Sequence, residues 1–200
     1  MVDIWPFYGT RPYNQDAKSL IAPSTDHLSI ENIEIFRKNN YWNYLKVLNP
    51  IGQLKEKDSL QEARKHFNEM KDNDVVKKDE KLNIYVYQIE LSNHKQLGFL
   101  SLASINDFAK NIIKPHEKIY ESRKLERADQ MINLKTQIGP IYVSYPSNES
   151  VSNLLLSLIK KPPSYDFESF DKSIHRLWCV NDNKIIEDIK NLSKNINYLY

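Results

Sequence analysis

Glycine and cysteine, two residue types that often mark nucleotide and metal sites, are scarce in this sequence. Only 4 of the 200 residues are glycine, and no Gly-rich phosphate-binding loop is present. Cys179 is the only cysteine, so the sequence excludes an internal disulfide and a metal site built from cysteines. Any nucleotide or metal chemistry must therefore come from other residue types.

The sequence also lacks a strong excess of one charge and any long hydrophobic run. Its 28 basic and 26 acidic residues leave a net charge of +2, which argues against nucleic acid or a membrane surface as a partner. No apolar run approaches membrane-spanning length, and the amino terminus does not have the pattern of a signal peptide. We therefore expect a cytoplasmic protein.

Helical and strand-like patterns alternate along the chain. Alternation over residues 84–91, a polar turn and a second run over 96–103 predict a β-hairpin. The other elements that the patterns predict are helices at 29–38, 104–108, 122–134, 150–160 and 182–192, and strands at 41–48, 140–145, 174–180 and from 197 onward. Residues 1–28 are expected to be irregular. We predict one mixed α/β domain over residues 1–200, with a partly antiparallel sheet and several flanking helices.

A longer helix is predicted from Ser59 to about Lys71. Ser59 and Glu62 match the capping box that opens many helices. Four apolar residues follow at the spacing of one buried stripe: Leu60, Ala63, Phe67 and Met70. We expect His66 at the surface or boundary of this helix. We expect the tryptophans in the core or at a contact between subdomains: Trp5, Trp42 and Trp178.

Charged residues and a histidine, the side chains best suited to catalysis or anion binding, are concentrated between Lys110 and Arg127. Pro115 is followed directly by His116 and Glu117, and the proline favours a loop or an element end there. The whole stretch holds six basic and three acidic residues, a local excess of +3 that suits an anionic ligand such as a phosphate. The alternative is that His116 and Glu117 form a structural pair beside a solvated helix face.

Several segments, in order along the whole chain, carry a resemblance to one family. The opening segment Ile4 to Pro12 resembles a -PF-G-RP- motif, and residues 21–26 (IAPSTD) are similar to an -APPYD- motif. The other matching segments are the hairpin at 84–102, PHEK at 115–118 against -PHERT-, Arg127, the stretch 140–145, and LWCV at 177–180 against -LW-V-. As an ordered set they resemble the bacterial and archaeal domain of unknown function 1015 family.

The resemblance implies a fold related to ParB and sulfiredoxin and an activity similar to that of free L-serine kinases. The cofactors would be ATP or ADP with Mg²⁺, and the acceptor a small amino acid. Under this resemblance Glu117 is the base or a metal ligand, His116 lies at the phosphate, and Asp26 binds the substrate amine or the metal. The candidates for phosphate binding are Lys118, Arg127 and Arg11.

This chain departs from the family pattern in ways that keep a second function open. Ser24 and Thr25 replace Pro-Tyr of one motif, and Lys118-Ile119 replaces Arg-Thr of another. Family members continue with a Gly-His-His-Arg segment and a further half, so we expect this chain to be an amino-terminal portion with an incomplete kinase site. The alternative function is a non-catalytic nucleotide- or ligand-binding module. An open strand edge near Tyr200 would favour homo-oligomers.

Overall fold

The computed structural model describes residues 1–13, 16–21, 29–48, 56–115, 120–197 and 199–200. Contacts within the chain divide it into two compact units. Unit 1 is formed by Met1–Gly9, Asp79–Lys118 and Ile141–Tyr200, and unit 2 by Thr10–Lys78 and Ile119–Pro140. One domain spanning residues 1–200 stays a prediction. None of the described helices is long and apolar enough to cross a membrane.

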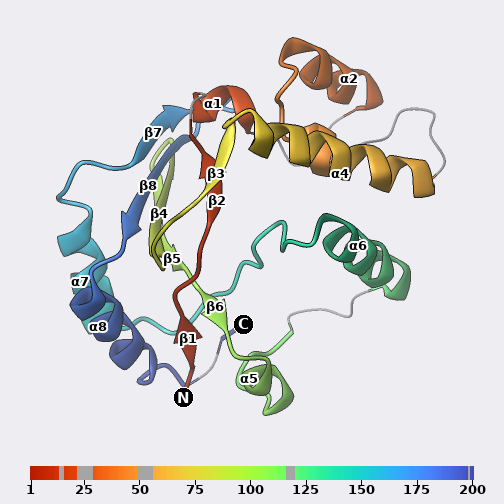
Figure 1. Cartoon of the computed structure of the whole chain (residues 1–200). Helices are drawn as coiled ribbons and strands as arrows, with labels where there is room; N and C mark the ends of the chain where they lie inside the picture. The colour runs from red at the N-terminus through yellow and green to blue at the C-terminus, as the bar shows by residue number, and fades with distance from the viewer. Residues whose placement is uncertain (14–15, 22–28, 49–55, 116–119, 198) are drawn as a thin grey trace. The chain divides into compact units, whose positions relative to one another are not determined.

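Unit 1 is built around a four-stranded antiparallel sheet (Figure 1). Its strands, in the order β5-β4-β8-β7, are His94–Leu100, Ile84–Leu91, Ile174–Val180 and Tyr165–Glu168. The strands β4 and β5 form the hairpin that the alternation predicts, from Tyr85 opposite Leu100 to Leu91 opposite His94. The prediction of a mixed α/β fold with a partly antiparallel sheet is therefore confirmed.

Two helices, α7 (Glu149–Leu158) and α8 (Asn183–Ser193), cover one face of this sheet (Figure 1). Asn148 and Asp182 cap them through their side-chain oxygens. Alternate residues of a strand point to the same face, so one set from β4 and β8 meets the helices. The buried core of unit 1 contains Ile84, Val86, Trp178 and Val180 from the sheet, and Val151, Leu155, Ile186 and Ile189 from the helices.

A line of charged and polar side chains crosses all four strands of the sheet. Arg176 on β8 bonds Asp166 on β7 and both Gln88 and Glu90 on β4, each at 3.1 Å. Glu90 also pairs with Lys95 on β5 at 3.2 Å. Lys95 and then Arg176 lower the pKa of Glu90, which keeps the carboxylate charged. Arg176 therefore ties the strands together.

The described residues among the first 28 form more regular structure than the sequence indicates. They contain β1 (Ile4–Trp5), which pairs with β6 (Leu102–Ala103) in unit 1, and β2 (Thr10–Pro12), which pairs with β3 (Val76–Lys78) in unit 2. They also contain α1 (Ala17–Leu20) in unit 2. The partner strands are distant in sequence, and periodicity within the first 28 residues cannot reveal such pairing.

Unit 2 is mainly helical, with α2 (Ile30–Asn39), α3 (Leu45–Leu48), α4 (Glu56–Asp72) and α6 (Glu121–Leu134). The predicted apolar stripe of α4 is confirmed, since Ala63, Phe67 and Met70 are buried in the core of this unit. The predicted capping box is wrong. The helix begins at Glu56, and Ser59 lies buried within its first turns.

The predicted strand over residues 41–48 is also wrong. The side chain of Asn40 accepts from the backbone N–H of Trp42, and that of Asn43 accepts from the N–H of Leu45, each at 2.9 Å. Asparagine side chains of this kind replace strand ladder bonds and start turns or helices. The segment therefore forms turns followed by α3, although its bulky aromatic residues are typical of strands.

His66 is buried in unit 2, which corrects its expected place at the surface or boundary of the helix. It is 8% exposed, stacks on Trp42 with ring centroids 5.9 Å apart, and meets the edge of Tyr41 at 5.3 Å. Among the described residues its Nε2 has no hydrogen-bond partner. Burial, and then Lys46, lower its pKa below the ordinary value of 6.5.

The lowered pKa of His66 leads to a prediction for acid stability. Because of His66, the folded state binds fewer protons than the unfolded state. The free energy of unfolding is therefore unaffected by this group above about pH 6.5 and decreases as the pH drops below that value. We expect the variant His66→Phe, which keeps a ring against Trp42, to lose less stability than the wild type between about pH 7 and pH 5. Denaturant unfolding at several pH values measures this.

The matched control is His94→Phe, at the exposed tip of the hairpin. That variant should keep the pH dependence of the wild type. Equal slopes for the wild type and His66→Phe would contradict the assignment of the acid sensitivity to His66.

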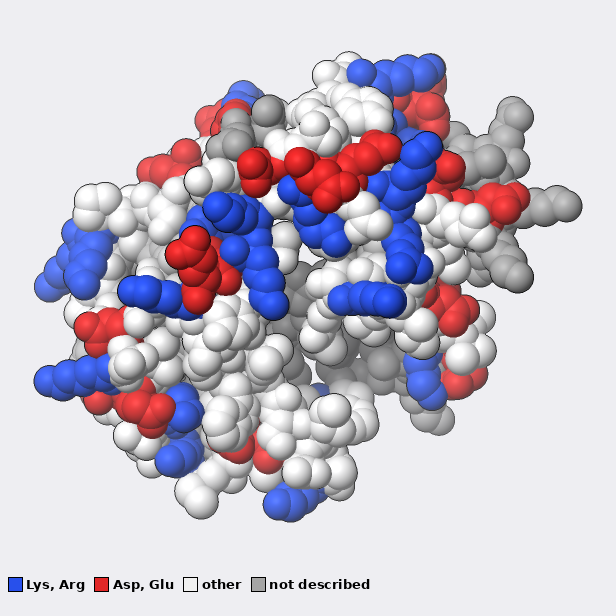
Figure 2. Space-filling model, in the orientation of Figure 1, with Lys and Arg blue, Asp and Glu red and all other residues white. Residues whose placement is uncertain are grey.

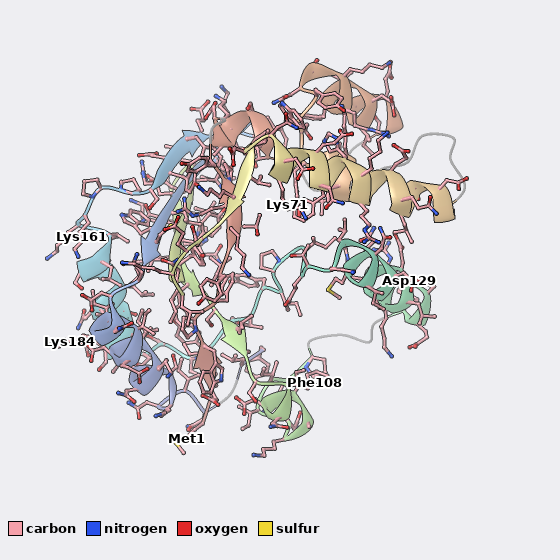
Figure 3. The ribbon with its side chains drawn as sticks, in the orientation of Figure 1. Met1, Lys71, Phe108, Asp129, Lys161 and Lys184 are labelled. Atoms are coloured by element: carbon pink, nitrogen blue, oxygen red, sulfur yellow. The ribbon has the colours of Figure 1, made fainter. Side chains whose placement is uncertain are left out.

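The surface of unit 1 around β1, β6 and α5 (Ile105–Ala109) carries few charged side chains (Figure 2). Its exposed apolar residues are Trp5, Leu102, Ile105 and Phe108, the last of which is labelled in Figure 3. Trp5 is 49% exposed, so it is not a core residue, and its expected alternative place at a contact between subdomains stays a prediction. Lys190 lies over its ring at 4.8 Å instead. Homo-oligomer formation stays a prediction.

Candidate functional site

The last described residues of the chain are held between two other segments of unit 1. Leu199 pairs in parallel with Ile113: its N–H donates to the carbonyl of Ile112 at 2.9 Å, and its own carbonyl accepts from Lys114 at 2.8 Å. On its other side Tyr200 exchanges two backbone hydrogen bonds with Ser144, at 2.8 and 2.9 Å. We name residues 112–115, 143–145 and 199–200 the chain-end junction.

The junction corrects two expectations from the sequence. Residues 140–145 form no strand, and only Ser144 of that stretch is joined to Tyr200. The segment at 199–200 is bonded on both sides, so the open edge expected there is not found. Backbone groups on both sides satisfy this segment, which removes the template that an unpaired strand would offer to another chain.

Helix α5 anchors the first segment of the junction. The backbone carbonyl of Asp107 accepts from the N–H groups of Ile112 and Ile113, at 2.8 and 3.1 Å. The buried carboxylate of the same residue accepts from the backbone N–H of Asp3 at 2.7 Å. One aspartate thus joins the N-terminal strand, α5 and the start of the junction, which fixes where Lys114 and Pro115 lie.

The side chains at the junction combine a cation with aromatic rings. Nζ of Lys114 lies 5.4 Å from the ring centroid of Tyr200, within the range of a cation–π contact. Burial raises the pKa of Tyr145, which keeps its phenol protonated. Pro115 has no N–H and cannot extend the backbone pairing beyond Lys114. The paired segment therefore ends where the His116-Glu117 motif begins.

The model of the DUF1015 family, described as a protein of unknown function, matches residues 4–200. This chain belongs to the DUF1015 family. No curated protein and no solved structure matches it. The resemblance noted from the ordered motifs is therefore confirmed for the family, while a relation to ParB, sulfiredoxin or serine kinases stays a proposal.

Four of the six site residues expected for a DUF1015 kinase lie outside the described residues: Asp26, His116, Glu117 and Lys118. The other two lie in unit 2, on separate elements. Arg11 is on β2 opposite Lys77, and Arg127 is an exposed residue of α6 that donates to Gln130 Oε1 at 3.1 Å. Within the part of the chain that is described, no three His, Cys, Asp or Glu side chains are grouped to hold a metal.

The -PF-G-RP- motif of this DUF1015 chain has a structural explanation at Gly9. The N–H of Gly9 donates to the hydroxyl of Tyr85 at 2.8 Å, and that hydroxyl donates to Asp79 at 2.5 Å. Phe7 packs on the same tyrosine with ring centroids 5.0 Å apart. Burial, and then the bond to Asp79, raise the pKa of Tyr85. These contacts make Phe7 and Gly9 packing residues of unit 1.

A Cβ at Gly9 would collide with the hydroxyl and ring of Tyr85. We therefore expect Gly9→Ala to lower the free energy of unfolding by about 1–3 kcal/mol, the usual cost of overpacking. The control is Gly98→Ala on β5, where an added Cβ meets nothing within 4 Å. Chemical denaturation compares the two. Equal stabilities of the two variants would show that the contact between Gly9 and Tyr85 is not tight.

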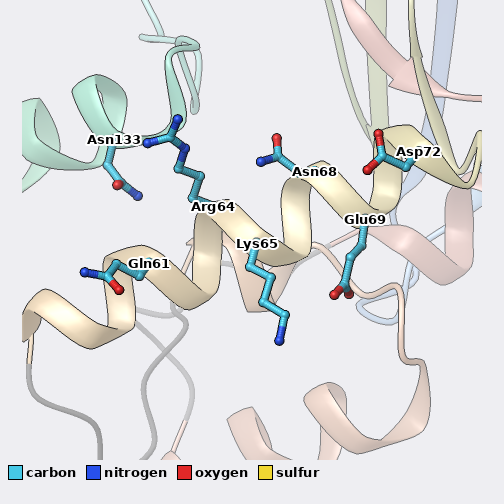
Figure 4. A pocket seen from close by; sticks show the side chains of 7 residues that line it. All are labelled: Gln61, Arg64, Lys65, Asn68, Glu69, Asp72 and Asn133. Atoms are coloured by element: carbon cyan, nitrogen blue, oxygen red, sulfur yellow. The ribbon is translucent and has the colours of Figure 1, made fainter.

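Unit 2 has one open hollow of about 590 Å³ along α4 (Figure 4). Its lining residues are Gln61, Arg64, Lys65, Asn68, Glu69 and Asp72 of α4, with Asn133 of α6. Arg64 and Asn133 lie between the two helices, whereas Lys65 and Glu69 extend from the other side of α4 (Figure 4). Two basic and two acidic side chains cancel, so this hollow has no preference for an anion such as phosphate.

Proposed function

We propose that this chain contributes to the site of a small-molecule kinase of the free L-serine kinase type, with ATP or ADP and Mg²⁺ as cofactors. The observation that carries the proposal is the parallel pairing of Leu199 with Ile113. Parallel segments leave their pairing at the same end. A segment that follows Tyr200 would therefore start beside Pro115, next to the His116-Glu117 motif.

The family resemblance suggests which chemical groups this geometry would bring together. It implies that the segment after Tyr200 carries Gly-His-His-Arg, which helps to bind nucleotide phosphate in related folds. Phosphoryl transfer depends mainly on positioning and on neutralising the phosphate charge. The chain-end junction would bring that phosphate-binding segment to Lys114 and Pro115, which directly precede His116, Glu117 and Lys118 in the sequence.

The remaining candidates take roles that match their residue types. Glu117 would accept the proton of the serine hydroxyl or bind Mg²⁺, and Asp26 would bind the amine of the substrate or the metal. Bound Mg²⁺ would supply charge neutralisation at the phosphates. Arg11 and Arg127 remain candidates for phosphate by residue type alone, since arginine binds phosphate through two parallel hydrogen bonds.

A product assay by mass spectrometry tests the proposal. The chain, and a form extended with the Gly-His-His-Arg segment of a family member, are each incubated with L-serine, Mg²⁺ and either ATP or ADP. O-phosphoserine from the extended form supports the kinase. If a folded extended form gives no product but binds the nucleotide, the function is the non-catalytic binding module instead.

A further inference from the structure

Four side chains of unit 1 form a continuous chain of hydrogen bonds. Tyr87 Oη lies 2.6 Å from His175 Nδ1, and His175 Nε2 lies 2.7 Å from Ser173 Oγ. Ser173 Oγ in turn donates to Asp171 Oδ1 at 2.5 Å. Tyr87 comes from β4, His175 from β8, and the other two from the turn before β8. We name these four residues the Tyr87 relay.

The direction of the relay follows from what each group can donate. A carboxylate only accepts, so Ser173 gives its single hydroxyl proton to Asp171 and must accept from His175 Nε2–H. A neutral imidazole protonated at Nε2 has a bare Nδ1, so the hydroxyl of Tyr87 donates to it. Burial lowers the pKa of His175, although Asp171 raises it, so the ring is neutral at pH 7. Every proton therefore points from Tyr87 toward Asp171.

The imidazole ring is held in one orientation. Phe167 on β7 lies directly opposite His175 and stacks on it, with centroids 5.4 Å apart and planes 12° apart. The backbone N–H of Ser173 also donates to Asp171 at 3.0 Å, which fixes the turn that carries both residues. A base held this way keeps its Nδ1 aimed at the phenol, so proton transfer needs no rearrangement.

The side chain of Tyr87 is not fully enclosed by the protein. Tyr87 is half-buried, and its direct neighbour on β5 is Gly98. A Cβ at Gly98 would meet nothing within 4 Å, so the position on β5 opposite Tyr87 is open. Since the proton of Tyr87 is committed to His175, the lone pairs of its oxygen stay available to an incoming group.

We propose that Tyr87 is a nucleophilic tyrosine that attacks small acyl or sulfonyl electrophiles while His175 takes its proton. The oxygen of Tyr87 forms the new bond, the leaving group departs with the electrons of the bond that breaks, and the phenol proton moves to Nδ1 of His175. Ser173 and Asp171 stabilise the imidazolium that results. This activity is independent of the proposed kinase function and involves none of its residues.

The relay predicts a pH dependence that ordinary tyrosines do not show. Burial and Asp171 raise the pKa of Tyr87, so free phenolate does not form at neutral pH and the reaction must proceed through His175. The titratable groups that face His175 are Asp171 and Tyr87. The rate should stay level from about pH 8 to pH 6.5 and fall only below, as His175 becomes protonated. An unassisted phenol slows tenfold for each pH unit across that range.

Labelling with benzenesulfonyl fluoride tests the proposal. The sulfonate ester forms on the oxygen of Tyr87 as fluoride leaves, and peptide mass spectrometry locates it. We expect Tyr87 to react faster than exposed Tyr142, Tyr87→Phe to lose the label, and His175→Gln to slow it by about 10²-fold or more.

Asp171→Asn is a second variant that is expected to fold, because Asp171 is exposed. It should fold normally and slow the labelling of Tyr87 with no change at Tyr142. Labelling of Tyr142 before Tyr87, a tenfold loss for each pH unit between pH 8 and pH 6.5, or an unchanged rate in folded His175→Gln and Asp171→Asn would each overturn the proposal.

Discussion

Replacement of Trp178 by alanine is expected to lower the free energy of unfolding by about 3–5 kcal/mol, the range for large aromatic residues in cores. Trp178 is 6% exposed and lies in the core of unit 1 between β8 and its covering helices. Its Nε1–H donates to the carbonyl of Lys161, in the turn after α7, at 2.7 Å. The change would leave a cavity and an unpaired carbonyl together.

Chemical denaturation followed by circular dichroism measures this loss. Trp5→Ala is the matched control, because Trp5 is half exposed and contributes mainly its contact with Lys190. We expect that control to cost about 1 kcal/mol or less. If both variants lost the same stability, the core of unit 1 would not depend on Trp178.

Replacement of Glu117 by glutamine is expected to lower the rate of O-phosphoserine formation by about 10²- to 10⁴-fold in the extended form of the protein. This is the usual contribution of a general base, and glutamine cannot accept the proton of the serine hydroxyl. The measurement is the initial rate of product formation by mass spectrometry at saturating L-serine, ATP or ADP, and Mg²⁺.

Glu121→Gln is the control for this loss. Glu121 is the first residue of α6, is exposed, and pairs only locally with Lys124 at 3.1 Å among its described contacts. Its replacement should leave the rate unchanged. If the Glu117→Gln variant retained full activity, Glu117 would not be a catalytic residue. The kinase proposal itself would still be tested by the product assay.

Local sequence patterns were sufficient for those elements whose residues are neighbours along the chain. The hairpin of β4 and β5 follows from alternation and a short polar turn, and the apolar stripe of α4 follows from its helical spacing. The family could also be recognised from the order of its motifs, since each motif is a short continuous segment.

The same patterns failed where tertiary contacts override local preference. Aromatic residues predicted a strand at 41–48, but the side chains of Asn40 and Asn43 bind the backbone and start turns there. His66 was expected at the surface or boundary of its helix, yet it is buried against Trp42 and Tyr41. A tryptophan can lie in a core or on a surface, and Trp5 and Trp178 differ only in what covers them.

The sequence by itself determined the mixed α/β class, the hairpin, the family, and the residue types available for phosphate chemistry. Only the tertiary structure decided which of these residues meet. Tyr87 and His175 lie 88 positions apart and come together because β4 and β8 pair in one register. Ile113 and Leu199 meet in the same way at the chain-end junction. The physical reason is that paired strands are joined by backbone hydrogen bonds. These bonds form between groups that every residue except proline has, so the local sequence does not show which segments pair.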